Sequence, residues 1–452
     1  MNIKIPEVIN KESVDFPYND KPVIFYTLDN GHTVIVAHKP GQLFNVSTWI
    51  KTGSINEDDS ITGISHFLEH LMFKGTPKYP AGEFDRILEA KGAVVNAATW
   101  KDYTFYYVTL PMGDNSDNLV QAIELHSDMM LNPLVPDEEI GPVFDPNAPD
   151  VEEKRERFVV IEEIRMRDDN HWTKTFDALN SLMYKVHPYK RDVIGTAEVI
   201  ASISRETILD YYKKWHTPEN MFTIITGDVD SEEVIEIVKR NFVFPEERKT
   251  LNPKYEKEPL QTESRYVENS RQDITTGFFI GGFHGPEPKN LKDSICLDIL
   301  SDALGEGKSS RMYQNLIEKQ EEQVFTVAGT TQYEFRDGNV FLAQANFIPD
   351  KKEKALELIK GELQKVCENC ISEAELNKAK KRLKVGFAED SETVSEIGEI
   401  IGHFMTVYED ISCYASYLSV LENITAQDVL EVAKKYFALN KLSISILMPE
   451  NF

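Results

Sequence analysis

The sequence predicts an α+β protein made of two homologous halves, and an internal repeat is the main observation behind this prediction. Residues 203–215 and 424–436 match at an offset of 221 residues. Both segments begin with Ser or Thr at an N-cap position and carry apolar residues at helical spacing. A strand-like run follows each of them, at 221–225 and at 442–446.

A second pair of segments supports the duplication. Residues 67–75 and 297–305 match at an offset of 230, so the two halves differ by small insertions. Strand-like runs such as 34–37 and 278–280 alternate with amphipathic helices in both halves. One matched pair could arise by chance, whereas two pairs in the same order indicate a duplicated unit.

Proline and charge mark the expected boundaries. A stretch at 244–271 holds three prolines, many charges and little apolar periodicity, so we expect a linker there. This divides the chain into a first half at 1–243 and a second at 272–452. Another irregular stretch, 136–153, has four prolines and seven acidic residues and is expected to be a surface insertion.

The composition excludes several classes of function. The 452 residues carry 49 Lys and Arg against 75 Asp and Glu, a formal charge of −26, which argues against a nucleic-acid binder. No run approaches the ~18 apolar residues of a membrane helix. Because the first 17 residues have charges and no apolar stretch, we expect a cytoplasmic protein, although a leader already removed would not be seen.

The sharpest local pattern is His66-Phe-Leu-Glu69-His70, in a helical segment that runs on to Lys74. Two histidines four positions apart lie on one helix face and can reach one metal ion, and Glu69 lies on nearly the same face. His-x-x-Glu-His is a known zinc-peptidase signature, with the carboxylate acting on water. The same pattern also arises in helices with surface histidines, so a third ligand is needed.

Two further segments offer the missing parts of a site. Residues 156–164 form a predicted helix in which Glu156 and Glu163 are two turns apart on one face. Residues 96–107 are β-branched and aromatic and are predicted to form one strand after a turn at Gly92. Other histidines, including His126, are expected to be packing or surface residues.

With these motifs the chain resembles the pitrilysin-type (M16) zinc metallopeptidases, especially the short subfamily that includes the mitochondrial processing peptidase β-subunit and its bacterial relatives. The resemblance covers nearly the whole chain and implies two α/β-sandwich halves, each a mostly antiparallel sheet packed against helices, in the LuxS/metallopeptidase-like fold. Its landmarks are Gly63-Ile64-Ser65, Lys74-Gly75-Thr76, Asn132-Pro133-Leu134, His187-Pro188-Tyr189 and Gly195-Thr196.

The resemblance implies a role for each candidate residue. His66 and His70 match the family's zinc ligands, Glu69 its general base and Glu163 its distal glutamate ligand. Glu156 matches a second catalytic-site carboxylate that supports the centre without binding zinc. One Zn²⁺ per chain is expected.

Two details of this assignment depend on spacing. Glu162 is adjacent to Glu163, and the seven-residue spacing to Glu156 selects Glu163. This glutamate lies 93 residues past His70, further than the family usually places it, and the 136–153 insertion accounts for the excess.

The resemblance also implies a place for the substrate. Asn96 and Ala97 match the edge strand on which a peptide substrate lies by β-augmentation.

The second half departs from the pattern. Cys296, Ile299 and Leu300 stand where the first half has its two histidines and Glu69, so this half is expected to hold no metal. Active single-subunit members have an Arg and, seven residues later, a Tyr, where this chain has Glu318 and Phe325, or Ile317 and Val324 one register back.

We therefore expect a zinc endopeptidase subunit that cleaves peptides or unfolded segments. The expected partner is a homologue that lacks zinc and supplies the Arg and Tyr in a heterodimer; a homodimer is the alternative. The competing functions are an inactive structural or assembly subunit of the same fold, and a peptide-binding clamp that holds zinc without hydrolysis.

Overall fold

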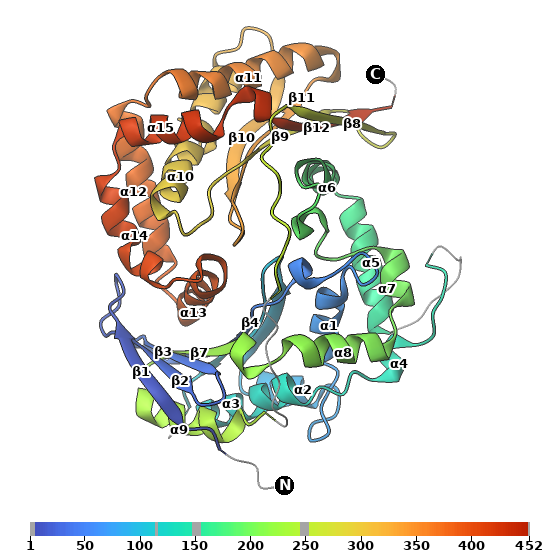
Figure 1. Cartoon of the computed structure of the whole chain (residues 1–452), viewed down its shortest axis with the longest axis vertical. Coiled ribbons are helices and arrows are strands. Elements are labelled where there is room, and N and C mark those ends of the chain that lie inside the picture. Colours follow the sequence, from blue (N-terminus) through green and yellow to red (C-terminus); the bar gives the residue numbers. More distant parts are fainter. Residues whose placement is uncertain (1–4, 114–115, 147–154, 245–252, 451–452) are drawn as a thin grey trace. The chain divides into compact units, whose positions relative to one another are not determined.

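The computed structural model describes residues 5–113, 116–146, 155–244 and 253–450, which fold into two compact units (Figure 1). Unit 1 consists of the described residues of 1–165, 191–254 and 388–406, and unit 2 of those of 166–190, 255–387 and 407–452. Each unit is a sheet with helices on both faces (Figure 1).

The sheet of unit 1 has seven strands in the order β1-β2-β3-β7-β4-β6-β5. All neighbours are antiparallel except β3 and β7, which run parallel. The central strands β4 and β7 are almost wholly buried, as expected for β-branched and aromatic runs covered on both faces. The strands are β1 (Val8–Val14), β2 (Val23–Leu28), β3 (Thr33–His38), β4 (Leu43–Ile50), β5 (Val94–Thr99), β6 (Thr104–Pro111) and β7 (Met221–Gly227).

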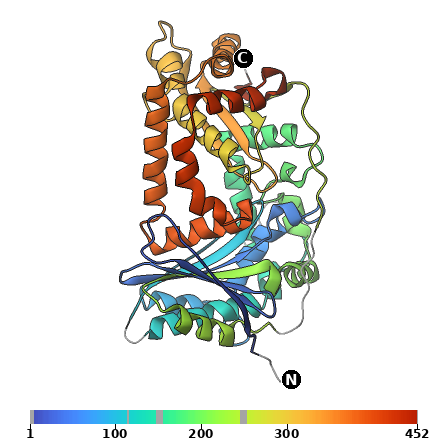
Figure 2. The ribbon, with the colours of Figure 1, turned by 60° about the vertical axis from the view of Figure 1, so that its left-hand side comes forward.

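Helices cover both faces of this sheet. Helices α3 and α9 pack on one face, and α13 packs on β4 and β7 from the other, as Figures 1 and 2 both show. An extended apolar core joins the sheet to α1, α3, α8 and α9. The helices are α1 (Ile64–Met72), α2 (Glu83–Glu89), α3 (Asp117–Leu131), α4 (Asp137–Ile140), α5 (Glu156–Asp168), α7 (Ala197–Ser202), α8 (Arg205–Trp215), α9 (Ser231–Asn241) and α13 (Val394–His403).

The sheet of unit 2 has five strands in the order β10-β11-β9-β12-β8. Its neighbours are antiparallel except β12 and β8, which run parallel. Helix α6 packs on one face, while α10 and α11 contact the sheet and pack against α15. The elements are β8 (Arg265–Arg271), β9 (Gly277–His284), β10 (Phe325–Tyr333), β11 (Val340–Phe347), β12 (Ser443–Pro449), α6 (His171–Met183), α10 (Leu291–Gly305), α11 (Lys352–Glu368), α12 (Glu373–Glu389), α14 (Ser412–Asn423) and α15 (Ala426–Tyr436).

The two sheets share one topology, which confirms the predicted α+β fold of two similar halves. The order β3-β7-β4-β6-β5 corresponds to β8-β12-β9-β11-β10, with the single parallel pair at the same place. The repeated segments appear as α8 and α15, capped by the side chains of Ser204 and Thr425. Unit 1 has the additional strands β1 and β2 beside β3.

Each unit also contains a helix from the other half of the sequence. Helix α6 precedes the expected linker yet packs on β8, β9 and β12, and α13 follows the linker yet packs on β4 and β7. The compact units are therefore not contiguous in sequence. The division at 1–243, 244–271 and 272–452 stays a prediction about the duplicated halves; residues 265–271 of that linker form β8, and residues 245–252 lie outside the described part.

The structure corrects one local prediction and describes the region of another only in part. The single strand expected at 96–107 is two antiparallel strands, β5 and β6, because the chain turns between them and the Trp100 N–H bonds to the Tyr103 carbonyl at 2.8 Å. The expected insertion at 136–153 begins with the short helix α4, and its residues 147–153 are outside the described part. None of the helices described is both long and apolar enough to cross a membrane.

Candidate metal centre

Helix α1 presents three of the predicted site residues on one face. His66 and His70 are one turn apart, and their ring centroids are 4.8 Å apart. The rotation of the helix is set by its other face, whose apolar side chains lie in the core: Phe67, Leu68, Leu71 and Met72. With this face buried, the two imidazoles and Glu69 must project to the same side.

Helix α5 brings Glu163 to the two histidines. A Glu163 carboxylate oxygen lies 3.6 Å from His66 Nε2 and 3.5 Å from His70 Nε2. Each of the three residues offers one ligand atom, and all three atoms lie within 4.8 Å of one another. Within the described ranges, this is the one group of three or more His, Cys, Asp or Glu residues so arranged.

These distances fit a small divalent cation. Ligand atoms placed tetrahedrally at ~2.1 Å from zinc are separated by about 3.4 Å, close to the two measured separations. Two imidazole nitrogens and one carboxylate are a common ligand set of catalytic zinc sites, which leave one position open. All three side chains are partly exposed, so the ligand atoms are not sealed in the core.

Glu156 and Lys74 stand behind the ligand atoms. Glu156 accepts a hydrogen bond from His70 Nδ1 at 3.0 Å and forms an ion pair with Lys74. Burial alone would lower the pKa of His70, but its bonds to Glu156 and Glu163 raise it to about 9. A carboxylate on Nδ1 orients the ring so that Nε2 faces the cluster, as carboxylates do at known metal sites.

Glu69 lies next to this cluster but outside the ligand group. Its side chain is buried, and the Thr99 hydroxyl donates a hydrogen bond of 2.5 Å to one carboxylate oxygen. Burial raises the pKa of Glu69, opposed by the Thr99 bond and by the charge of His70. A raised pKa suits a carboxylate that must take up a proton near neutral pH.

The strand next to α1 is the edge of the sheet. Helix α1 contacts β5, which pairs with β6 on one side only among the described strands. Asn96 and Ala97 lie in the middle of β5, opposite Tyr107 and Tyr106. The Ala97 N–H donates to the Asn96 side-chain oxygen at 2.9 Å. An extended peptide added to this edge would lie beside the cluster.

Glu162 and Glu163 are adjacent in sequence, but their side chains make different contacts in the structure. Glu162 points away from the histidines and forms an ion pair with Arg165 at the surface. Sequence reasoning assigned no role to Thr99 or Lys74, which contact Glu69 and Glu156. The two-residue period of a strand could have pointed to Thr99, because it follows Ala97 by two residues and so faces the same side of the sheet. Nothing local connects Lys74 to Glu156 across 82 residues.

The corresponding helix of unit 2 has no such group among its residues. Cys296, Ile299 and Leu300 of α10 are fully buried in the core. Of the two residues expected where other members have Arg and Tyr, Glu318 is exposed and Phe325 is buried at the start of β10. Neither side chain has the chemistry to stabilise an oxyanion.

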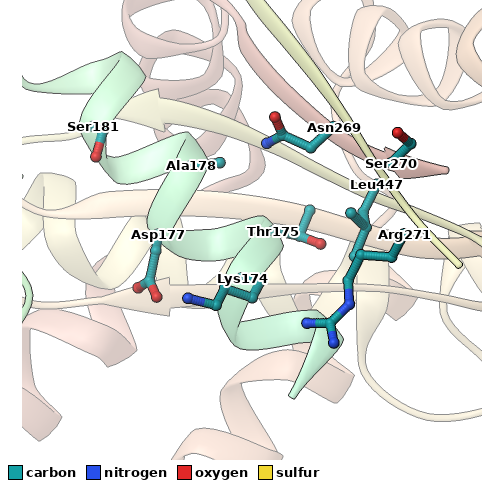
Figure 3. A pocket seen from close by; sticks show the side chains of 9 residues that line it. All are labelled: Lys174, Thr175, Asp177, Ala178, Ser181, Asn269, Ser270, Arg271 and Leu447. Carbon is teal, nitrogen blue, oxygen red and sulfur yellow. The ribbon is translucent and has the colours of Figure 1, made fainter. Parts of the chain in front are cut away.

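A separate pocket of about 360 Å³ lies in unit 2 between α6 and β8 (Figure 3). Its charged groups are already paired: Arg271 bonds both oxygens of Asp273, and Lys174 forms an ion pair with Asp168. Asp177 accepts from an arginine of α5. No functional role follows from this lining, which consists of Lys174, Thr175, Asp177, Ala178, Ser181, Asn269, Ser270, Arg271 and Leu447.

Family models match most of the chain. The model described as insulinase (peptidase family M16) matches residues 33–197, and the peptidase M16 inactive domain matches residues 202–383. The first range contains α1, β5 and α5, and the second contains most of unit 2.

Similar proteins align with nearly the whole chain. The zinc protease PqqE of Helicobacter pylori is 31% identical over 434 residues, covering 94% of this chain and 92% of its own. An uncharacterized zinc protease of Rickettsia felis is 27% identical and covers 91% and 94%.

Solved structures agree. The crystal structure of a protease from Helicobacter pylori has a TM-score of 0.83 at 28% identity, covering 98% of this chain and 100% of its own. A putative M16-like peptidase from Alicyclobacillus acidocaldarius has a TM-score of 0.77 at 21% identity, covering 97% and 100%, and shares the fold. Identity above 30% over nearly all of both chains, on a fold of two duplicated sheets, shows that this chain belongs to the M16 family of peptidases.

Proposed function

We propose that this chain is a zinc-dependent endopeptidase subunit that hydrolyses peptides or unfolded segments. The observation that carries the proposal is the cluster of His66, His70 and Glu163 beside the buried Glu69 and the open edge of β5. Relatives named zinc proteases support the same chemistry at the level of the family.

The donor set favours one zinc ion per chain, held by His66 Nε2, His70 Nε2 and a Glu163 oxygen. A zinc ion bound there would supply Lewis-acid chemistry at a peptide carbonyl and at water. Glu156 would keep the His70 ring in place through its bond to Nδ1.

Glu69 is the proposed general base. Its carboxylate would take a proton from the attacking water and pass it to the leaving amine nitrogen. The Thr99 hydroxyl holds one carboxylate oxygen, which leaves the other to receive the proton. In this role Thr99 is a positioning residue.

The substrate is proposed to lie along β5 as an added strand. Backbone hydrogen bonds bind any extended sequence, which suits a peptidase for unfolded segments. The Ala97 N–H is satisfied by the adjacent Asn96 side chain, so a substrate carbonyl would replace that bond without breaking the sheet. A folded protein seldom offers such a strand, because its backbone groups are already paired.

The direct test is the variant Glu69→Gln, with zinc content and cleavage of an unstructured peptide measured on the same preparation. Zinc should remain at one per chain while cleavage falls by at least ~10²–10⁴, the usual contribution of a positioned acid–base group. Undiminished cleavage would remove Glu69 from this role. A parent chain that binds zinc but never cleaves, even with a partner, would indicate the clamp function instead.

The partner is part of the proposal. Because Glu318 and Phe325 stand at the places where the resemblance puts Arg and Tyr, neither position offers a donor to the carbonyl oxygen. We therefore propose a heterodimer with a zinc-less homologue that supplies both, with a homodimer as the alternative. The second candidate function is a structural subunit without turnover; absence of zinc from the purified parent would favour it. The cytoplasmic location stays a prediction.

A further inference from the structure

Glu57 is a buried carboxylate at the N-terminus of α1, the helix that carries His66, Glu69 and His70. It is 5% exposed and follows the short turn at 54–56. One carboxylate oxygen accepts the Gly63 N–H at 2.8 Å, and the other accepts the Ser65 N–H at 3.0 Å. Both bonds satisfy backbone donors at the start of the helix that no intrahelical carbonyl can reach.

The helix cannot be capped in the usual way. Its N-cap residue is Gly63, with a φ of +88°, a left-handed conformation that L side chains rarely adopt. A Cβ there would lie 2.4 Å from the Ile194 carbonyl oxygen and 2.9 Å from Gly195 Cα. Because no side chain fits at position 63, the cap has to come from another segment.

Other helices of unit 1 solve the same problem locally. Helices α7, α8, α9 and α13 are capped by their own N-cap side chains, those of Thr196, Ser204, Asp230 and Thr393. In α9 the Asp230 carboxylate accepts two backbone N–H groups, as Glu57 does for α1. The difference lies in what the capped turn carries.

In α1 the capped turn carries a metal ligand. Ser65, whose amide Glu57 accepts, directly precedes His66 in the first turn, and the Ser65 hydroxyl is bonded to the Tyr211 hydroxyl at 2.7 Å. If the first turn frayed, His66 would move against His70 and Glu163, which are held by later turns and by α5. We propose that Glu57 is a positioning residue for the metal centre, fixing the first turn of α1 so that His66 meets the other two ligands.

This inference rests on the proposed function, and it concerns affinity for the metal as well as activity. Burial raises the pKa of Glu57 to about 7, opposed by the hydrogen bonds of Ser65 and Gly63. The experiment is therefore carried out at pH 8, where the carboxylate is ionised. A negative charge at a helix N-terminus is also favoured by the helix dipole.

The test compares Glu57→Ala and Glu57→Gln with the matched cap variant Asp230→Ala. Zinc dissociation constants are measured by competition with a chelator, and thermal unfolding is followed on the same metal-free samples. We expect both alanine variants to lose stability, but only Glu57→Ala to bind zinc more weakly, by the ~10–100-fold typical of a lost supporting residue. Glu57→Gln keeps one acceptor oxygen and should show a smaller loss of affinity.

Cobalt substitution gives a second readout. The visible absorption of the Co²⁺-loaded protein, which reports ligand geometry, should change in the Glu57 variants and stay as in the parent in Asp230→Ala. Zinc affinity and cobalt spectra equal to those of the parent in Glu57→Gln and in any folded Glu57→Ala would overturn the inference. A parent chain that binds no zinc, or a His70→Ala variant that binds it as tightly, would instead overturn the proposed function.

Discussion

Helix α1 of unit 1 and helix α10 of unit 2 occupy the same place in the duplicated fold and differ in what they carry. Helix α1 contacts the edge strand β5, and α10 contacts the corresponding strand β10. In α1 the carboxylate of Glu69 bonds to the Thr99 hydroxyl of β5. In α10 the carboxylate of Asp298 accepts from the Gln332 amide of β10 at 3.1 Å.

A carboxylate that links this helix to the edge strand is therefore present in both units. Asp298 has a second donor, the Tyr417 hydroxyl at 3.2 Å, and burial raises its pKa well above the usual range. What distinguishes unit 1 is the pair of histidines and the approach of Glu163. The comparison teaches that a helix carboxylate bonded to the edge strand does not by itself make a candidate metal centre, because Asp298 is bonded in this way on a helix without histidines.

The largest expected effect comes from removing Glu163, the proposed third ligand. The zinc affinity of Glu163→Ala should fall by more than the ~10–100-fold that is typical when a supporting residue is lost, because this variant removes a proposed direct ligand. Unit 1 would then resemble unit 2, which lacks such a cluster among its described residues. Zinc content after dialysis against a weak chelator measures the effect.

The control is the neighbouring Glu162→Ala, whose side chain pairs with Arg165 at the surface. It should retain stoichiometric zinc. Loss of zinc from Glu162→Ala with retention in Glu163→Ala would reverse the assignment of the ligand.

The second largest effect concerns the Arg and Tyr that are missing at positions 318 and 325 of unit 2. Losing one oxyanion-hole donor costs ~10²–10³ in rate, so a chain with Glu318 and Phe325 should cleave weakly alone. Adding a purified zinc-less homologue that carries the Arg and Tyr should raise peptide cleavage by at least that factor. As a control, the same homologue is added to the Glu69→Gln variant, which should stay inactive. Full activity of the isolated parent would show that no such partner is needed.

The smallest effect concerns stability. Unit 1 has a buried chain of hydrogen bonds from His32 through Thr223 and Thr48 to His126, with lengths of 3.0–3.1 Å. Burial lowers the pKa of His32 to about 4 and that of His126 to about 3. In unit 2 the buried His187 is bonded instead to the carboxylate of Asp337 at 3.1 Å.

Because an unfolded histidine has a pKa near 6.5, the unfolded state takes up protons first as the pH falls below that value. Each of the two histidines should then cost about 1.4 kcal/mol of stability per pH unit until its folded pKa is reached. Between pH 6.5 and 5 the free energy of unfolding, measured with urea, should therefore fall by about 2 kcal/mol less in His126→Gln than in the parent. A parent and a variant with parallel pH dependence would contradict this.

Local patterns predicted much of the fold. The spacing of apolar residues and the caps Ser204 and Thr425 located α8 and α15, since helix periodicity and capping depend on neighbours in sequence. The expected single strand at 96–107 was wrong because β-branched and aromatic residues stand on both sides of the turn, which only the polar pair Lys101 and Asp102 marks. Without Gly or Pro, a turn marked by a single Asp is a weak signal against a strand-like composition on both sides.

The candidate site divides in the same way. The spacing of His66, Glu69 and His70 determined by itself that the three side chains share a helix face, because 3.6 residues complete a turn. Only the tertiary structure decided that Glu163 of α5 reaches this face while Glu162 does not, and that Glu57 and Thr99 hold the helix and its carboxylate. Such contacts join residues of separate elements, and they depend on how the buried faces of helices and strands pack together.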